Sequence, residues 1–311
     1  MRKFFAFISV LIILNLVGCR QNDNTNVNTN IRAEATMNNK VSLELPKNLE
    51  KFRDKFENSV KSYVKITAKK GKTLAWESKF GGTPYLPIGY EYPIDSNGEP
   101  MRLLAQINFE EMPGMEYYPT KGILQFYISP KDDLYGADLD KPTAQNNFKV
   151  IYIPEVIKDT SKIINDFSFV SSSEDDYFPI GAEGKLNYEL DYVPVGIRDY
   201  QFEKIFNKTV YDFFDIKGDN EEEILEWEQS LDWYENKYSC AGHRIGGYAY
   251  FTQNDPREFA NKDYDVLLLQ IDSDDELDIM WGDVGIANFF IRLEDLMKMD
   301  FSKVLYNWDC C

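Results

Sequence analysis

The sequence predicts an α+β fold in which internally duplicated, largely antiparallel β-sheet units are flanked by helices. Two observations lead to this prediction. Three short blocks recur in the same order in both halves of the chain, and stretches with helical spacing of apolar residues lie before and between the copies. We place the two repeats at about residues 74–130 and 240–292, inside a single domain over residues 42–311.

The blocks are a double glycine, an apolar run that contains a glutamine, and an aromatic-rich run that follows a glycine. Their positions in the two copies are residues 80–82 and 245–247, 103–107 and 267–271, and 122–128 and 285–291. The glutamine follows the second glycine by 24 residues in the first copy and by 23 in the second. This match in order and spacing predicts a duplicated supersecondary unit.

Each copy predicts a turn followed by two strands. A double glycine suits a turn or a close approach of two backbones. Leu103, Ala105 and Ile107 then alternate with Leu104 and Gln106, which is the pattern of a strand with one apolar and one partly polar face. The aromatic-rich third block has high sheet propensity. The two units would form either a sandwich or one continuous sheet.

Three stretches outside the repeated blocks have apolar residues three and four positions apart, which predicts amphipathic helices. They run from Leu49 to Tyr63, from Phe202 to Phe214 and from Ile224 to Tyr234. The three glutamates at residues 221–223 precede the third stretch, and acidic side chains stabilise the N-terminus of a helix.

The first 18 residues have the layout of a secretory signal peptide. Arg2 and Lys3 give a positive start, and the apolar run over residues 4–16 is too short to span a bilayer stably. Gly18 precedes Cys19, and the four residues ending at Cys19 match the lipobox of bacterial lipoproteins, whose cysteine is acylated. We therefore expect a lipid-anchored protein of the cell envelope; the alternative is an ordinary signal peptide followed by an accidental cysteine.

The predicted lipid anchor leads into a tether over residues 19–41. Residues 21–30 are almost wholly Asn, Asp, Thr and Gln, a composition that buries too little apolar surface to fold. We expect a disordered segment that holds the globular body away from the membrane.

The formal net charge of -18 limits the partners of the protein. Such a surface repels phosphate backbones and anionic headgroups, so we expect no binding of nucleic acid, and membrane contact through the lipid alone. An acidic body attracts a basic partner, although acidity also serves solubility.

Three cysteines remain after Cys19, and their chemistry is left open by the sequence. Cys240 and His243 have the C-x-x-H spacing of a metal clip, which Cys310 and Cys311 would complete. The alternatives are a disulfide between Cys240 and one of the terminal pair, or thiols that are buried or free.

Two glutamines and two aromatic–carboxylate pairs are the candidate ligand-binding residues. Gln106 and Gln270 occupy equivalent repeat positions, where they would line a pocket or satisfy buried backbone groups. The pairs would line a sugar- or peptide-binding groove, or be core tryptophans beside turn aspartates. They are Trp281 with Asp283 and Trp308 with Asp309. The sequence has no phosphate-binding glycine motif or nucleophile elbow, so we assign no catalytic residue and expect no cofactor.

Seven motifs carry a resemblance to a known family. They are GGTP at residues 81–84, LAQINF at 104–109, HRIGGY at 243–248 with FTQNDPR at 251–257, LLQIDS at 268–273, MWGD at 280–283 and NFFI at 288–291. With them the chain resembles the YwqG-like family, a bacterial domain of unknown function, over about residues 45–309. The resemblance implies an α+β fold with internal duplication, implies no activity, and by association with toxin systems implies an immunity or partner-binding role. The lipoprotein leader departs from the usual family pattern.

These features lead us to expect a membrane-anchored, non-enzymatic protein that binds another protein, either basic in charge or a toxin, through an acidic and aromatic surface. A first alternative is a glycan- or peptide-binding surface receptor, suggested by 20 Tyr, 21 Phe and 5 Trp. A second is a hydrolase with an Asp/Glu pair, which predicts carboxylates of raised pKa in a cleft between the repeats.

Overall fold

The computed structural model describes residues 41–311, apart from residues 171, 174 and 215–219. Residues 41–311 form one compact unit. The predicted signal peptide, Cys19 and all but the last residue of the predicted tether lie outside the described residues. Within the described part, none of the helices combines the length and the apolar composition that crossing a bilayer requires.

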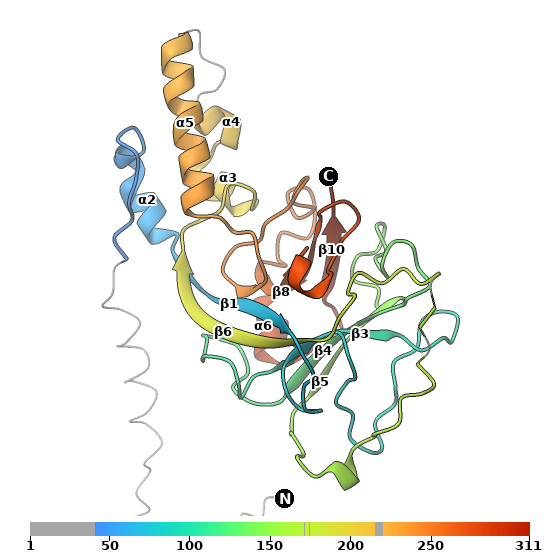
Figure 1. Cartoon of the computed structure of the whole chain (residues 1–311). Coiled ribbons are helices and arrows are strands. Elements are labelled where there is room, and N and C mark those ends of the chain that lie inside the picture. The colour runs from blue at the N-terminus through green and yellow to red at the C-terminus, as the bar shows by residue number, and fades with distance from the viewer. Residues whose placement is uncertain (1–40, 171, 174, 215–219) are drawn as a thin grey trace, which may run out of the picture. The chain divides into compact units, whose positions relative to one another are not determined.

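Ten strands form one continuous sheet in the described part of the chain (Figure 1). Their order across the sheet is β10-β9-β8-β7-β1-β6-β2-β3-β4-β5, and every neighbouring pair is antiparallel. The predicted antiparallel sheet is thus confirmed, in its continuous form. The strands are β1 Lys61–Lys70, β2 Lys79–Phe80, β3 Arg102–Asn108, β4 Ile123–Ile128, β5 Phe148–Ile153, β6 Gly184–Val193, β7 Arg244–Gly246, β8 Val266–Asp272, β9 Ile286–Ile291 and β10 Leu305–Asp309.

The strands on the two sides of the central β1–β6 pair follow one another in the same way. From β1 the sheet continues outward through β7, β8, β9 and β10, and from β6 it continues through β2, β3, β4 and β5. The β3–β4 pairing shifts between Leu103 and Ala105, and the β8–β9 pairing shifts between Leu267 and Leu269. Such bulges change the face toward which the following side chains point.

The double glycines stand at the ends of β2 and β7 and adopt left-handed backbone conformations. The φ angles are 62° and 72° at Gly81 and Gly82, and 76° and 69° at Gly246 and Gly247. A Cβ atom on Gly247 would lie 2.9 Å from the Cβ of Tyr63, closer than two such atoms approach. Of the two predicted alternatives, a turn or a close approach, the close approach is confirmed at Gly247.

Five short or medium helices and three 3-10 turns accompany the sheet among the residues that the structure describes. They are α2 Arg53–Asn58, α3 Gln201–Phe206, α4 Val210–Phe213, α5 Glu221–Lys237 and α6 Leu293–Met297, with η1 Glu50–Phe52, η2 Thr160–Lys162 and η3 Asp275–Leu277. The predicted helix around residues 224–234 is confirmed by α5. Its N-terminus is capped by Asn220, whose side chain accepts hydrogen bonds from the backbone N–H groups of Glu222 and Glu223.

Two of the predicted helices were wrong in extent. The helix expected to reach Tyr63 ends at Asn58, because the following residues enter β1 and pair on both sides, with β6 and with β7. The helix expected over residues 202–214 is divided into α3 and α4. Asn207, with a φ of 56°, ends α3, and Thr209 caps α4 by accepting from the backbone N–H of Asp212.

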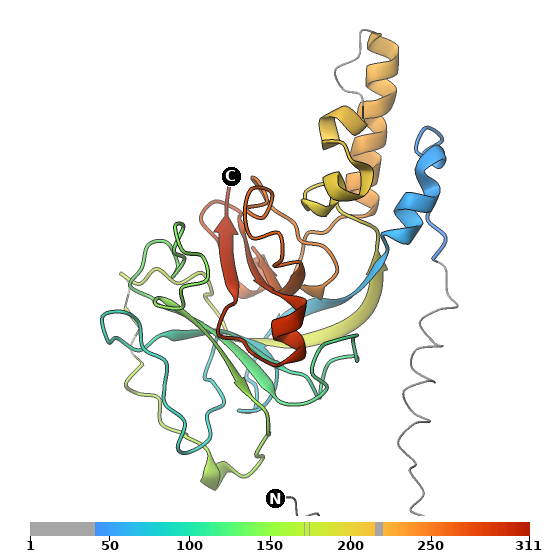
Figure 2. The same cartoon turned by 180° about the vertical axis from the view of Figure 1, so that it is seen from behind.

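The helices α2 to α5 bury a core of their own, made largely of aromatic rings. Phe206 lies 4.6 Å from Phe202, 4.5 Å from Phe213 and 4.7 Å from Phe56 between ring centroids, and Phe56 lies 4.8 Å from Tyr234 of α5. These rings hold α5 at the end of β6, from which it extends away from the sheet (Figures 1 and 2).

The main core lies between the two halves of the curled sheet. Phe126 of β4 and Phe289 of β9 have ring centroids 4.8 Å apart, and Phe289 stacks on Tyr306 of β10 at 4.4 Å. The Tyr118 hydroxyl donates to the Leu267 carbonyl at 2.8 Å. Aromatic rings therefore fill the seam between the halves at these strands.

Candidate functional site

Gln106 and Gln270, two of the candidate ligand-binding residues, are fully buried. The Nε2 of Gln106 donates to the carbonyls of Ala75 and Glu77 at 2.7 and 2.8 Å, and its Oε1 accepts from the backbone N–H of Tyr85 at 2.8 Å. Each amide atom is thus engaged by backbone that flanks the first double glycine.

Gln270 makes the corresponding bonds in the second half. Its Nε2 donates to the carbonyls of Cys240 and Gly242 at 2.8 and 2.7 Å, and its Oε1 accepts from the backbone N–H of Tyr250 at 2.8 Å. Both glutamines therefore fasten a strand to the loops around a double glycine, which is the backbone-satisfying alternative. Their ligand-binding role stays a prediction.

The structure brings Trp281 and Trp308 together around Tyr135. The centroid of the Tyr135 ring lies 5.5 Å from that of Trp281 and 4.8 Å from that of Trp308, and the Trp308 indole N–H donates to the Leu134 carbonyl at 2.7 Å. Trp281 is fully buried, so it offers no face to a ligand. This half of the predicted groove is packed core.

The two partner aspartates lie in different surroundings. Asp283 is exposed on the turn before β9. Asp309 accepts hydrogen bonds from the backbone N–H groups of Thr252 and Gln253 at 3.2 and 2.9 Å, and burial raises its pKa above the ordinary value. Asp309 thus orders the loop after β7, and its binding role also stays a prediction.

The three cysteines near the predicted metal clip differ in burial. Cys240 is buried, Cys310 half-buried and Cys311 exposed, and all three are free thiols. Burial raises the pKa of the Cys240 thiol to about 11, so it is protonated at neutral pH. Within the described ranges, no group of three or more His, Cys, Asp or Glu side chains is placed to hold a metal ion.

Both ring nitrogens of His243 are engaged by the protein. Nδ1 accepts from the backbone N–H of Asp272 at 3.0 Å, so the proton of the neutral ring is on Nε2, which lies 3.0 Å from a carboxylate oxygen of Asp274. This hydrogen bond holds the pKa of Asp274 below its ordinary value. His243 therefore joins β7 to the turn that follows β8.

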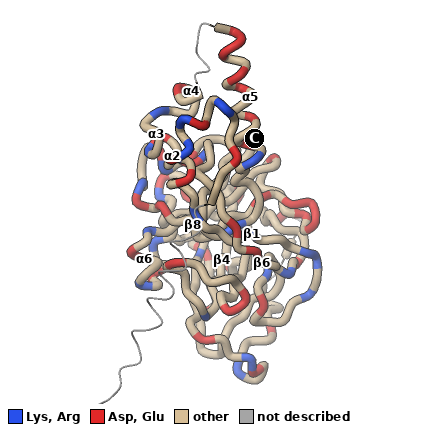
Figure 3. Tube along the Cα trace, turned by 90° about the vertical axis from the view of Figure 1, so that its left-hand side faces the viewer, with Lys and Arg blue, Asp and Glu red and all other residues tan. Residues whose placement is uncertain are grey.

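The outer face of α5 is an acidic surface, which we call the α5 acidic face. The helix buries Trp227, Ser230 and Tyr234 on its inner face. Apart from Lys237 in its last turn, the helix has no basic residue, and its charge is visible along its length in Figure 3. The exposed carboxylates are Glu221, Glu222, Glu223, Glu226, Glu228 and Asp232.

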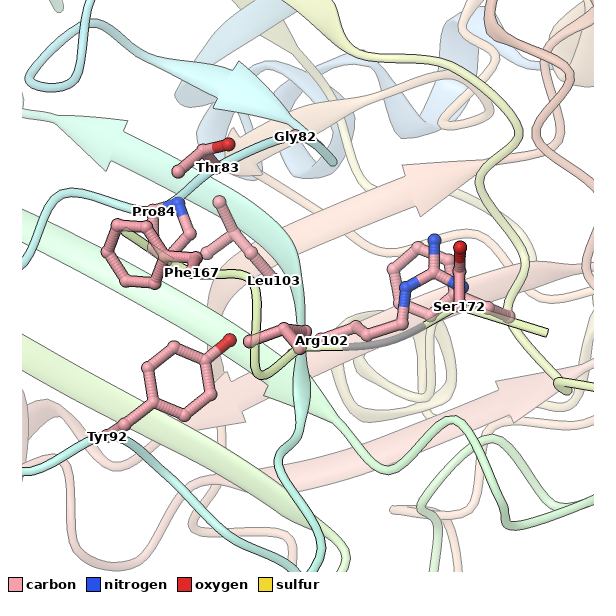
Figure 4. Close-up of a pocket in the computed structure, with 10 residues that line it drawn as sticks. Gly82, Thr83, Pro84, Tyr92, Arg102, Leu103, Phe167 and Ser172 are labelled. Atoms are coloured by element: carbon pink, nitrogen blue, oxygen red, sulfur yellow. The ribbon is translucent and has the colours of Figure 1, made fainter. Parts of the chain in front are cut away.

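A cavity of about 210 Å³ opens beside the first double glycine, at the start of β3 (Figure 4). We call it the Arg102 cavity. In the view of Figure 4 the Arg102 guanidinium lies on one side, with Tyr92 and Phe167 on the other. Leu103 and Pro84 complete the apolar part of the wall. Small-molecule sites commonly combine apolar and aromatic walls with a few polar groups.

The surroundings of Arg102 leave it charged but poorly partnered. Its guanidinium lies 3.8 Å from the centroid of the Phe178 ring, and its Nη1 lies 3.7 Å from a carboxylate oxygen of Asp176, beyond hydrogen-bond distance. Asp176 is already engaged by the Lys131 ammonium and by the backbone N–H of Ser173. Burial lowers the pKa of Arg102 from its ordinary value.

A buried ionic cluster lies beside β9, and two of its members belong to the FTQNDPR motif at residues 251–257. Arg257 is 1% exposed and donates to Asp255 from both Nε and Nη2, at 2.9 and 2.7 Å, and to Asp199 at 3.0 Å. Burial raises the pKa of Asp255, which Arg257 opposes. The cluster links the loop before α3 to the loop between β7 and β8, and its arginine is too buried to contact a ligand.

Sequence reasoning missed both Arg102 and this cluster as points of interest. Arg102 begins an apolar strand, where a single cation at a strand end is common and gave no signal. Arg257 lay inside a motif used for the resemblance, but nothing in the sequence indicated that Asp199 would join it.

Comparison with known proteins identifies a family. The family model for DUF1963, described as a domain of unknown function, matches residues 78–310. No curated protein matches the chain. The matched segment contains both double glycines, the Arg102 cavity and α5.

Proposed function

Since the chain belongs to the DUF1963 family, whose description gives no activity, we propose that it is a non-enzymatic binding protein, moored to a bacterial membrane by a lipid on Cys19. Its partner in this proposal is a protein of basic charge, with a secreted toxin as one candidate. The finer assignment to the YwqG-like group belongs to the same proposal and rests on the sequence motifs.

The observation that carries the proposal is the α5 acidic face. Its carboxylates lie on a helix that extends away from the sheet, so a partner reaches them without rearrangement of the core. The exposed Leu225, on the same helix, and Tyr211, on α4, add apolar contact area. A surface of one charge sign draws an oppositely charged protein and raises its association rate.

The non-enzymatic part of the proposal is supported by the two groups best suited to nucleophilic chemistry. His243 has both ring nitrogens in hydrogen bonds within the protein, and the Cys240 thiol is buried and protonated. The carboxylates with raised pKa that a hydrolase would need include Asp255 and Asp309, and both are engaged by backbone N–H groups. The hydrolase hypothesis therefore gains no support from this geometry.

Reversing the charge of the α5 acidic face is expected to weaken partner binding about tenfold or more, mainly by slowing association. The variant carries Glu226→Lys, Glu228→Lys and Asp232→Lys, which lie beyond the first turn and spare the helix N-terminus. Biolayer interferometry with purified products of the neighbouring genes, at several salt concentrations, measures the effect. Higher salt should reduce binding by the wild-type protein and not by the variant.

The matched control reverses three exposed carboxylates on loops of the β3–β5 half, Glu91, Glu99 and Asp133. It changes the net charge by the same amount and should leave the affinity within about twofold of wild type. Equal losses in both triple variants would mean that net charge, and not the α5 acidic face, attracts the partner.

The lipid anchor is tested separately. The wild-type mature protein is expected to partition into a Triton X-114 phase, and Cys19→Ser should move it to the aqueous phase because the acyl chains are lost. Cys311→Ser, which removes an exposed thiol, should partition as wild type. Mass spectrometry of the mature N-terminus that finds an unmodified residue would overturn the anchor.

We also propose that the two halves of the sheet arose by duplication. The equal strand order outward from β1 and β6, the paired bulges and the matching bonds of Gln106 and Gln270 support it. In this proposal β1 to β5 form one copy and β6 to β10 the other, which extends the repeats beyond the predicted residues 74–130 and 240–292. The first strand of each copy pairs with the second strand of the other.

A second candidate function, a peptide- or glycan-binding receptor, is favoured by the Arg102 cavity. Its volume is below the ~300–1,000 Å³ of sites for drug-sized ligands, so it suits one residue or one sugar unit rather than a long chain. The ring of Tyr92, with its centroid 6.0 Å from that of Phe167, offers an apolar wall for such a group.

A further inference from the structure

We propose that the Arg102 cavity recognises a carboxylate carried on a small, partly apolar body, with the C-terminal residue of a peptide as the fitting ligand. The inference deepens the receptor candidate and rests on it. It does not depend on the α5 acidic face, which lies on a different part of the molecule (Figure 1).

The charges at the cavity favour an anion although the protein as a whole is acidic. Two cations, Arg102 and Lys131, share one carboxylate, that of Asp176, which leaves a local charge of +1 from these three groups. Lys131 and the backbone N–H of Ser173 already engage Asp176. Burial by itself raises the pKa of Asp176, but these partners outweigh it and hold the pKa below its ordinary value, so Asp176 is ionised.

Arg102 has hydrogen-bond donors to spare. A guanidinium carries five N–H donors in a planar fork. In the described part of the chain, none of them makes a hydrogen bond, and the ion pair with Asp176 is 3.7 Å long. A carboxylate accepts two parallel N–H bonds from such a fork. Among the described residues, the Arg102 guanidinium has no carboxylate bound in this way.

The Phe178 ring fixes the direction of the fork. It lies 3.8 Å from the guanidinium carbon, which is stacking distance, so the donors are held in a plane beside the cavity. A pre-oriented donor loses less conformational entropy when a ligand binds.

The rest of the wall selects what the carboxylate is attached to. Leu103 and Pro84 are buried, and Tyr92 and Phe167 are half-buried with their rings at the cavity. The hydroxyl of Tyr92 donates to the Met101 carbonyl at 2.8 Å, so the ring is held in place. An apolar or aromatic side chain one residue in size fits this wall better than a polyanion does.

The cation is a property of the first half alone and is not required by the fold. Arg102 lies opposite Ile128 in the β3–β4 pairing, and Val266 lies opposite Ile291 at the corresponding place in the β8–β9 pairing. The sheet therefore accepts an apolar residue at this position, so the pairing of strands does not explain why an arginine is found here.

The test compares N-acetylphenylalanine, which has a free carboxylate, with its amide, using titration calorimetry on the full-length mature protein in detergent. We expect the acid to bind at least about tenfold more tightly than the amide, because a charge-assisted bidentate pair is lost in the amide. A second pair compares N-acetylmuramic acid, which carries a carboxylate, with N-acetylglucosamine. Tighter binding of N-acetylmuramic acid would make an acidic sugar the source of the carboxylate.

Variants test whether Arg102 causes the preference for the acid over the amide. Arg102→Gln should abolish the preference for the acid, and Arg102→Lys, which keeps the charge but not the fork, should reduce it. Arg198→Gln, at a half-buried arginine paired with Glu235, should leave it unchanged. Equal binding of acid and amide to the wild-type protein would overturn the carboxylate inference and leave the receptor candidate standing. No binding of any of the four compounds would overturn both.

Discussion

Arg257→Met is expected to lower the free energy of unfolding by about 3–5 kcal/mol, the cost typical of removing one partner from a buried ionic group. Arg257 and its two aspartates are each about 1% exposed or less at the side chain. Methionine leaves Asp199 and Asp255 as uncompensated charges in a region that water does not reach. Thermal unfolding followed by circular dichroism should show a midpoint lower by roughly 6–20 °C.

The loss should spread beyond the cluster, because its members hold backbone. Asp199 accepts from the N–H groups of Ala249 and Gln201, and Asp255 accepts from that of Tyr200, each at 3.0 Å. Arg257 also lies 3.8 Å from the centroid of the Phe290 ring on β9. Local hydrogen exchange should therefore increase in the loops before α3 and after β7.

The effect of Arg257→Met should depend on pH. Burial raises the pKa of Asp255 in the wild-type protein, and loss of the arginine removes the charge that opposes this rise. A carboxyl whose pKa is higher in the folded than in the unfolded state favours folding at low pH, and that advantage is lost as the pH rises through the folded-state pKa. The stability deficit of the variant should thus be smaller at pH 5 than at pH 8.

Two further variants control this result. Arg198→Met, at a half-exposed ion pair with Glu235, should cost about 1 kcal/mol or less. Adding Asp255→Asn to Arg257→Met should recover part of the loss, because one buried charge is removed. A deficit below about 1 kcal/mol for Arg257→Met would show that the cluster contributes little to stability.

Gln106→Leu and Gln270→Leu are each expected to lower the free energy of unfolding by about 3 kcal/mol or more. Each replacement keeps the size of the side chain and leaves three buried or partly buried backbone groups without their side-chain partner, at about 1–3 kcal/mol for each unsatisfied group. Urea unfolding measures both variants against wild type.

The comparison between the two glutamines also bears on the duplication. The three backbone bonds are equivalent, and Gln106 also accepts from the Gln125 side chain at 2.8 Å, so the loss at Gln106 should match that at Gln270 or exceed it by at most about 1.5 kcal/mol. Gln229→Leu, on the exposed face of α5, is the control and should change stability by about 0.5 kcal/mol or less. A large loss at one glutamine and none at the other would remove this support for two equivalent units.

Local patterns predicted four of the ten strands in the described part of the chain. The alternating run that begins at Leu103 is β3, the aromatic-rich runs are β4 and β9, and the run at residues 267–271 is β8. They succeed because the residues that specify each strand are adjacent in sequence. The helix expected to reach Tyr63 failed for the opposite reason: its apolar spacing is helical, but its last residues gain more from pairing with β6 and β7.

The candidate sites show the same contrast between what neighbouring residues specify and what contacts between distant segments decide. Gln106 and Gln270 could be found because their neighbours repeat, yet the sequence left open whether they bind a ligand or the backbone. The answer depends on loops that the fold brings into contact with each glutamine, although these loops lie 20 to 31 residues away in the sequence. The Arg102 cavity depends on Phe167 and Phe178, which the chain reaches only after β5.

By itself, the sequence determined the acidic charge, the spacing of the repeated blocks and the positions of the four strands β3, β4, β8 and β9, since these are properties of neighbouring residues. The tertiary structure decided which side chains meet: the pairing of β1 with β6 and β7, the burial of Arg257 between two aspartates, and the partly satisfied Arg102 beside two aromatic rings. Contacts of this kind join segments far apart in the chain, and their energies depend on burial and distance that no local pattern carries.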